Sequence, residues 1–146
     1  SDYPAYNILS VGCGGAPDLI AFEETMSVLD MKNIFYKGYD VNPFWSPIHR
    51  AIEQYTLSTQ YAYAELITKD IFDALRGGEL VAHNYNIIVL EYLLSHFPPQ
   101  NWANLAIELF DGLLQNVLQN RLDKSPFLFL INDIDHFQVR DCFCRS

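Results

Sequence analysis

The chain has 146 residues, half of them hydrophobic, and this length and composition suffice for one domain with a full core. Its net charge of -9 comes with few, scattered lysines and arginines, which argues against nucleic-acid binding by this segment alone. No run approaches the roughly 18 apolar residues of a membrane span, so we expect neither a membrane segment nor a membrane partner.

The stretch Asn7–Leu19, NILSVGCGGAPDL, predicts a strand, a glycine turn and the start of a helix. Glycine tolerates positive φ, and without a Cβ it lets backbone amides approach a ligand. A helix N-terminus adds N–H groups and a partial positive charge, which suit phosphate or carboxylate. Pro17 fits the first turn of that helix, where its missing N–H costs nothing. We therefore expect this stretch to be the centre of a ligand site.

The rest of the chain alternates between helical and strand patterns. Helices are predicted over Asp18–Leu29, from Pro47 towards Leu57, up to Leu75 and from Pro98 onwards, and strands over Ile34–Asp40, Tyr61–Thr68, Asn86–Leu90 and Phe127–Ile131. In the helix that starts at Pro47, we expect Ile48, Ile52 and Tyr55 to face the core. The continuous apolar run Asn86–Leu90 is typical of a central parallel strand that is buried on both faces.

This alternation predicts an α/β fold with a mostly parallel central sheet of about five strands and helices on both faces. Ligands of such sheets bind beyond the carboxyl ends of the strands. The residues that follow the predicted strands are Gly12–Gly15, Asp40, Asp70, Glu91 with Tyr92, and Asn132 with Asp133. We expect these residues to lie along one edge of the sheet.

The segment Val11–Gly15, V-G-C-G-G, resembles the first motif of the Rossmann-type (class I) S-adenosylmethionine-dependent methyltransferases. A glycine turn alone is shared with dinucleotide-binding folds, and the resemblance rests on the order of motifs from Asn7 to about Asp133. It implies a three-layer Rossmann-like fold, with residues 1–146 as a single methyltransferase-like domain. The family's sheet continues to a sixth and a seventh strand, which we do not find here. The alternatives are a divergent minimal form and a fragment of a longer chain with further domains, and we favour the fragment.

The resemblance also implies a binding site for S-adenosylmethionine. It places Gly12, Cys13, Gly14 and Gly15 at the methionine end of the cofactor. A side chain at the first of these glycines takes the space that the cofactor needs beside the backbone. We accordingly expect Gly12→Val to abolish cofactor binding while leaving the domain folded.

Two acidic residues follow the second and third predicted strands. A carboxylate at Asp40 can accept hydrogen bonds from both ribose hydroxyls, and members of the family commonly carry an acidic ribose ligand there. Asp70 matches the family's acid that accepts a hydrogen bond from the adenine amino group, with Ile71 as the apolar neighbour of the ring. The alternatives are local: Asp40 as the cap of the turn before Asn42, and Asp70 as the N-cap of the short helix.

The residues after the fourth strand decide the reaction in this family. Glu91, Tyr92 and His96 are the candidates for a catalytic base or for substrate contacts. The alternatives are a packing role for Tyr92 and a surface position for His96. Segment 90–97, LEYLLSHF, lacks the Asp/Asn-Pro-Pro-aromatic turn of the amino-directed nucleic-acid methyltransferases, which argues against that reaction. Methyl transfer from a sulfonium relies largely on positioning, so no base is required.

Cysteine and histidine usage predicts neither a disulfide framework nor a metal site. Three cysteines without framework spacing, and an N-terminus without the pattern of a secretory signal, indicate a reducing, cytoplasmic compartment. Cys142 and Cys144 have only His136 near them in the sequence, and two ordinary cysteines in a C-terminal helix are favoured over a zinc site. His49, His83 and His136 fall on predicted helix or loop positions away from the strand ends and form no ligand set.

The sequence therefore predicts a methyltransferase-like domain that binds S-adenosylmethionine and transfers its methyl group to an unknown acceptor, with a small molecule or a protein favoured. A catalytically silent domain of the same fold, with a structural or regulatory role, is the first alternative. An NAD-dependent oxidoreductase domain is the second. Gly12–Gly15 departs from that second alternative, because the pattern expected there is Gly-x-Gly-x-x-Gly.

Overall fold

The computed structural model describes residues 6–28, 34–58, 62–80, 85–118 and 128–133. Its strands are β1 (Tyr6–Val11), β2 (Ile34–Asp40), β3 (Ala62–Thr68), β4 (Ile87–Glu91) and β5 (Leu128–Asn132). All pair in parallel, in the order β3-β2-β1-β4-β5. The predicted α/β fold with a five-stranded, Rossmann-like parallel sheet is therefore confirmed.

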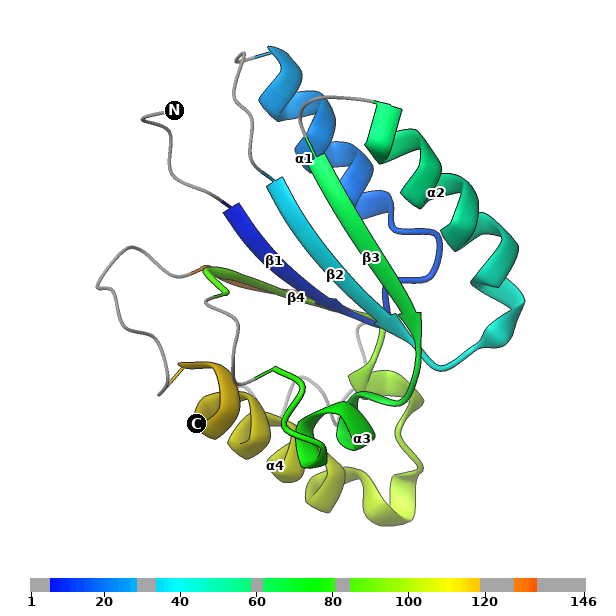
Figure 1. Ribbon diagram of the computed structural model, residues 1–146. Helices are drawn as coiled ribbons and strands as arrows, with labels where there is room; N and C mark the ends of the chain where they lie inside the picture. The colour runs from blue at the N-terminus through cyan, green and yellow to red at the C-terminus, as the bar shows by residue number, and fades with distance from the viewer. Residues whose placement is uncertain (1–5, 29–33, 59–61, 81–84, 119–127, 134–146) are drawn as a thin grey trace.

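Helices cover both faces of this sheet. Helices α1 (Pro17–Val28) and α2 (Ser46–Ser58) lie on one face, and α3 (Ile71–Arg76) and α4 (Trp102–Leu113) lie on the other (Figure 1). The chain moves outward from β1 to β2 and β3 and then returns to place β4 on the other side of β1. The carboxyl ends of β1 and β4 thus flank the point where the strand order reverses, which is where open α/β sheets bind ligands.

Several predicted positions lie outside the described residues. They are the helix end at Leu29, the strand starts at Tyr61 and Phe127, and the side chains of His83, His136, Cys142 and Cys144.

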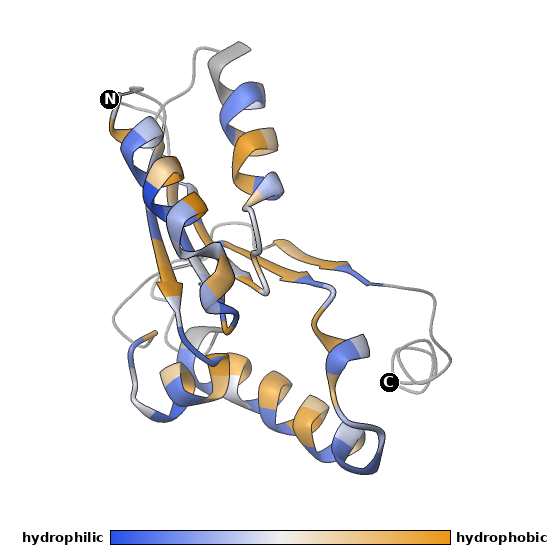
Figure 2. Ribbon diagram, turned by 90° about the vertical axis from the view of Figure 1, so that its right-hand side faces the viewer, coloured by the Kyte–Doolittle hydropathy of each residue, from blue (hydrophilic) through white to orange (hydrophobic). Residues whose placement is uncertain are grey.

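Alternate residues of the strands supply two separate cores. Leu9 and Leu90 point towards α3 and α4, whereas Ile8 and Val89 point towards α1 and α2. Residues 87–90 of β4 are all buried, which confirms the prediction of a central strand that is covered on both faces. In Figure 2 the strands are largely orange, and the helices carry both blue and orange residues.

Helix α4 packs, together with α3, into the core on one face of the sheet. Its predicted start at Pro98 is replaced by a 3-10 turn over Pro99–Asn101, and the α-helix begins at Trp102. The face buried by this helix comprises Trp102, Ala106, Leu109 and Leu113, which recur at helical spacing. From Leu114 to Leu118 the backbone widens into a π-helix, and the side chain of Leu114 is exposed.

The predicted inward face of α2 is confirmed for Ile52, which is partly buried against the core, and is wrong for Ile48 and Tyr55. Ile48 and Tyr55 are 44% and 56% exposed, whereas His49 and Thr56 are buried. Helix α2 packs on β3, the edge strand of the sheet. An edge strand has unpaired backbone groups that require polar partners, and Arg50 and Glu53 of α2 supply them at Leu66, whereas the buried His49 contacts the carbonyl of Gly14.

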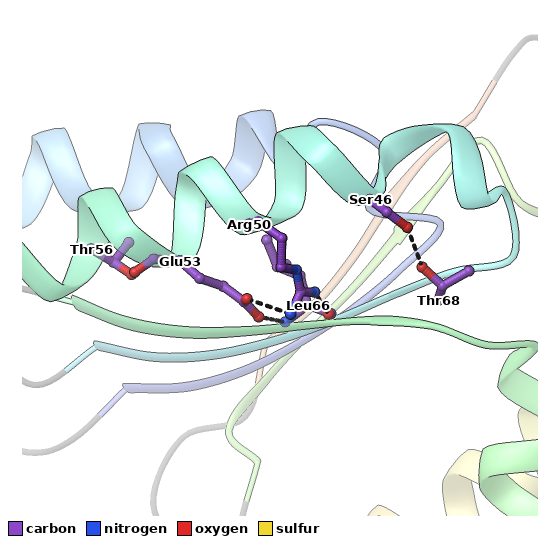
Figure 3. Close-up of polar contacts among 6 residues, drawn as sticks. All are labelled: Ser46, Arg50, Glu53, Thr56, Leu66 and Thr68. Carbon is purple, nitrogen blue, oxygen red and sulfur yellow. Dashed lines mark hydrogen bonds and ion pairs between the residues drawn. The ribbon is translucent and has the colours of Figure 1, made fainter.

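Figure 3 shows how α2 satisfies the backbone of β3. Arg50 Nη2 donates to the carbonyl of Leu66 at 2.7 Å, and the amide of Leu66 donates to Glu53 Oε2 at 2.8 Å. Arg50 and Glu53 also form an ion pair at 2.7 Å. The hydroxyls of Ser46 and Thr68 lie 3.3 Å apart, two residues further along the same strand. At Leu66, side chains of α2 therefore take the place of a neighbouring strand.

Glu53→Ala should lower the free energy of unfolding by about 1–2 kcal/mol, because the amide of Leu66 loses its acceptor in a partly buried position. The measurement is urea unfolding, with the midpoint compared between variant and wild type. The matched control is Gln54→Ala, an exposed neighbour in the same helix, for which we expect a change within about 0.5 kcal/mol. Equal changes for the two variants would contradict this role of Glu53.

Candidate functional site

A cleft of about 570 Å³ opens at the carboxyl ends of the strands. Seven of the residues singled out in the sequence line it: Gly12, Asp40, Asp70, Ile71, Glu91, Tyr92 and His96. Aromatic side chains that the sequence did not identify also line it, namely Tyr39, Trp45, Phe72 and Phe97. The remaining candidates, Cys13, Gly14 and Gly15, are not among the lining residues. The cleft therefore combines carboxylates with aromatic rings.

The backbone of the glycine turn is bonded within the protein. The amides of Gly12 and Cys13 both donate to the carbonyl of Tyr39, at 2.8 and 3.1 Å. The amide of Gly14 donates to Asp40 Oδ2 at 2.8 Å. The indole of Trp45 packs over the turn, since a Cβ built on Gly14 would lie 3.6 Å from this ring. The turn is thus held by β2 and by the segment after it.

Gly12 is required by the backbone itself. Its φ is +74°, and an added Cβ would lie 2.5 Å from the carbonyl oxygen of Glu91. That oxygen belongs to the backbone of the buried strand β4, so it cannot move away cheaply. The expectation that Gly12→Val leaves a folded domain is therefore corrected: the glycine allows β1 and β4 to approach each other beside the cleft.

Asp40 has two structural partners and also lines the cleft. Its Oδ2 accepts from the amide of Gly14, and its Oδ1 accepts from the amide of Asn42 at 2.9 Å. The capping role that was the alternative for Asp40 is thus present. Each carboxylate oxygen has a second lone pair, so Asp40 retains the capacity to accept from a ligand.

Asp70 is the N-cap of α3, because its Oδ1 accepts from the amide of Phe72 at 2.8 Å. Ile71 is buried and contributes both to the core and to the wall of the cleft. Lys69, the lysine in the lining, forms an ion pair with Glu79. The hydrogen bond from Lys69 is the largest cause of the lowered pKa of Glu79. The positive charge in the wall is therefore already neutralised.

The segment after β4 is anchored by the end of β5. The amide of Tyr92 donates to the carbonyl of Asn132 at 2.6 Å, and the side-chain amide of Asn132 donates to Glu91 Oε2 at 3.1 Å. Asp133 Oδ2 accepts from the amides of Leu94 and Ser95 at 2.9 and 3.3 Å.

Tyr92 has a φ of +51°, a strained conformation for a non-glycine residue. His96, at the end of the 3-10 helix Leu94–His96, is exposed. Both residues line the cleft, and Tyr92 is held there by its bond to Asn132. Backbone strain like that of Tyr92 is concentrated at functional sites.

Burial raises the pKa of the Glu91 carboxyl, with a smaller contribution from the charge of Asp18, against the lowering effect of Asn132. A raised pKa in the folded state contributes stability that is complete below the ordinary glutamate pKa and is lost as the pH rises through the raised value. The stability of Glu91→Gln relative to wild type should therefore increase from about pH 4 to about pH 7. Urea unfolding at a series of pH values tests this, and a difference that stays constant or shrinks would contradict it.

His49 corrects the prediction that this histidine lies away from the strand ends. It is fully buried, and its Nε2 lies 2.7 Å from the carbonyl oxygen of Gly14 and 3.9 Å from Cys13 Sγ. A histidine in the first turn of the helix that comes after β2 is the feature of the sequence that indicates this position. Trp45 was not predicted either, because it lies in the turn between β2 and that helix, to which the sequence assigned no role in the site.

Cys13 lies beneath the glycine turn with 1% of its surface exposed. Burial, followed by the charges of Asp40 and Asp18, raises the pKa of its thiol to about 12. The thiolate is the reactive form of cysteine, so Cys13 is a packing residue rather than a nucleophile. Among the described residues, no group of three or more histidine, cysteine, aspartate or glutamate side chains is arranged to hold a metal ion.

No helix in the described part of the chain is long and apolar enough to cross a bilayer. Comparison of the chain with protein-family models and with curated proteins finds no match.

Proposed function

We propose that this domain binds S-adenosylmethionine in the cleft and transfers its methyl group to a small-molecule or protein acceptor. The observation that carries the proposal is the convergence of Gly12, Asp40 and Asp70 from the ends of three adjacent strands into one cleft, at the point where the strand order reverses. Asp40 would hold the ribose hydroxyls, and Asp70 with Ile71 would hold the adenine. When bound, the cofactor supplies a methyl group on a sulfonium, which is already activated for displacement.

The charge of the cleft supports this cofactor over a dinucleotide. Asp40, Asp70 and Glu91 line the cleft, and the ammonium of Lys69 is paired with Glu79. A pyrophosphate would be repelled by these carboxylates, whereas a sulfonium or an ammonium would be attracted. A pyrophosphate would need backbone amides of the glycine turn as donors, and the amide of Gly14 already donates to Asp40.

Isothermal titration of the 146-residue chain with S-adenosylmethionine, S-adenosylhomocysteine and NAD tests the proposal. We expect both sulfur ligands to bind and NAD to bind at least about tenfold more weakly. A tenfold ratio corresponds to a difference of about 1.4 kcal/mol in binding free energy, which the repulsion between pyrophosphate and the carboxylates of the cleft would supply. Tighter binding of NAD, or no binding of either sulfur ligand, would overturn the proposal. Binding of S-adenosylmethionine without methyl transfer to any acceptor would favour the catalytically silent alternative.

A further inference from the structure

The residue Gly14 is held on both sides by side chains from other elements. Its amide donates to Asp40 Oδ2 at 2.8 Å, and its carbonyl lies 2.7 Å from His49 Nε2. These two groups belong to the peptide units before and after the same Cα, so together they fix the backbone of Gly14. Glycine can adopt many backbone conformations, and its φ of +50° here is only one of them. The hydrogen bonds on both sides of Gly14 select this conformation.

The hydrogen in the second bond can be assigned by chemistry. A carbonyl oxygen only accepts, so Nε2 of His49 carries the hydrogen and donates it. Nδ1 of the same ring is buried and has no hydrogen-bond partner in the described structure. A buried imidazole with one polar atom unsatisfied is costly, and the bond from its other nitrogen to the glycine turn offsets part of that cost.

We propose that His49 is a positioning residue of the cleft, which fixes the direction of the Asp40 carboxylate through Gly14. Asp40 Oδ2 is bonded to Gly14 and its other oxygen to Asn42, so a displaced Gly14 turns the carboxylate about the remaining bond. His49 itself lies behind the turn and is not among the residues that line the cleft. This inference rests on the proposed function, because it assumes that Asp40 accepts from a ribose diol.

Two variants of similar length separate the bond from the packing. In His49→Gln the side-chain amide nitrogen is the same number of bonds from Cβ as Nε2, so it retains a donor for Gly14. His49→Met fills a similar volume without a donor. The control is Thr56→Val, a buried position on the same face of α2, two turns beyond His49. If the Met variant does not fold, His49→Asn replaces it, because its amide falls one bond short of Gly14.

The first measurement compares the affinity for S-adenosylhomocysteine with that for its 2′-deoxy analogue. In wild type and in Thr56→Val we expect a preference of about tenfold for the intact diol, the effect of one good hydrogen bond. His49→Met should reduce this ratio to about threefold or less, and His49→Gln should restore most of it. A merely structural role would weaken both ligands equally and leave the ratio unchanged. An unchanged ratio in the Met variant, or a wild type without diol preference, overturns the inference.

The second measurement needs no ligand. Amide hydrogen exchange at Gly14 should be slow in wild type, about tenfold or more faster in His49→Met, and slow again in His49→Gln. If wild type binds neither ligand, the proposed cofactor is wrong, whereas the exchange rates still decide whether His49 fixes Gly14. Equal exchange rates in all variants would overturn the role of His49 even if the cofactor binds.

Discussion

Gly12→Ala should destabilise the protein by about 3–5 kcal/mol, enough to unfold most of a marginally stable domain. The added Cβ would lie 2.5 Å from the backbone oxygen of Glu91, and an alanine at a φ of +74° is strained as well. Relief requires separation of β1 from β4, which pair directly in the middle of the sheet. Urea unfolding followed by far-ultraviolet circular dichroism measures the loss.

Gly78 provides a matched control for this substitution. Its φ of +72° is almost the same, but an added Cβ would meet no atom within 4 Å. Gly78→Ala should therefore show only the cost of the backbone conformation, about 1–2 kcal/mol. Similar losses for the two variants would mean that the approach of Glu91 to the glycine turn contributes nothing.

Asp40→Ala should weaken the binding of S-adenosylhomocysteine by about 2–4 kcal/mol, or roughly 30- to 1000-fold. The carboxylate is proposed to accept from both ribose hydroxyls, and its loss also releases the amides of Gly14 and Asn42. Titration calorimetry gives the affinities, and a melting curve for each variant shows whether the protein is folded. Asp73→Asn, an exposed acid on α3 outside the cleft lining, is the control and should bind like wild type.

Asp70→Asn should cost less, about 1–2 kcal/mol, because asparagine keeps one acceptor oxygen. An analogue with a 6-oxo group in place of the 6-amino group should bind wild type poorly, since two acceptors then face each other. The Asn variant should recover part of that loss by donation from its amide. Equal losses for both ligands in both proteins would remove Asp70 from the site.

For Asp40, the contradicting result is different: an unchanged affinity of Asp40→Ala for S-adenosylhomocysteine would contradict the proposed ribose contact.

The sheet and the cleft could be predicted because both follow from local pattern and from general topology. The apolar run of β4 indicates burial on two faces, and the parallel arrangement brings the ends of all strands to one edge. Asp40 and Asp70 were therefore predicted to lie near Gly12 without any knowledge of distances, and all three line the cleft.

The inward face of α2 could not be predicted in the same way. Apolar periodicity assumes that a helix packs on side chains, and Ile48 and Ile52 satisfied that pattern. The helix packs on the core through Ile52, but it also covers a strand edge and the glycine turn, where the partners are backbone groups of Leu66 and Gly14. Polar residues at Arg50, Glu53 and His49 meet those groups, and their roles depend on which strand lies at the edge.

The contact between α2 and β3 also determines how the molecule can meet other chains. A free strand edge is a template on which a strand of another molecule can add, and this is a common route to aggregation and domain swapping. At Leu66 the outward carbonyl and amide are both occupied, by Arg50 and Glu53. An incoming strand would have to displace this ion pair before it formed its first hydrogen bond there. The addition of a strand to β3 is therefore opposed at Leu66 by a helix of the same domain.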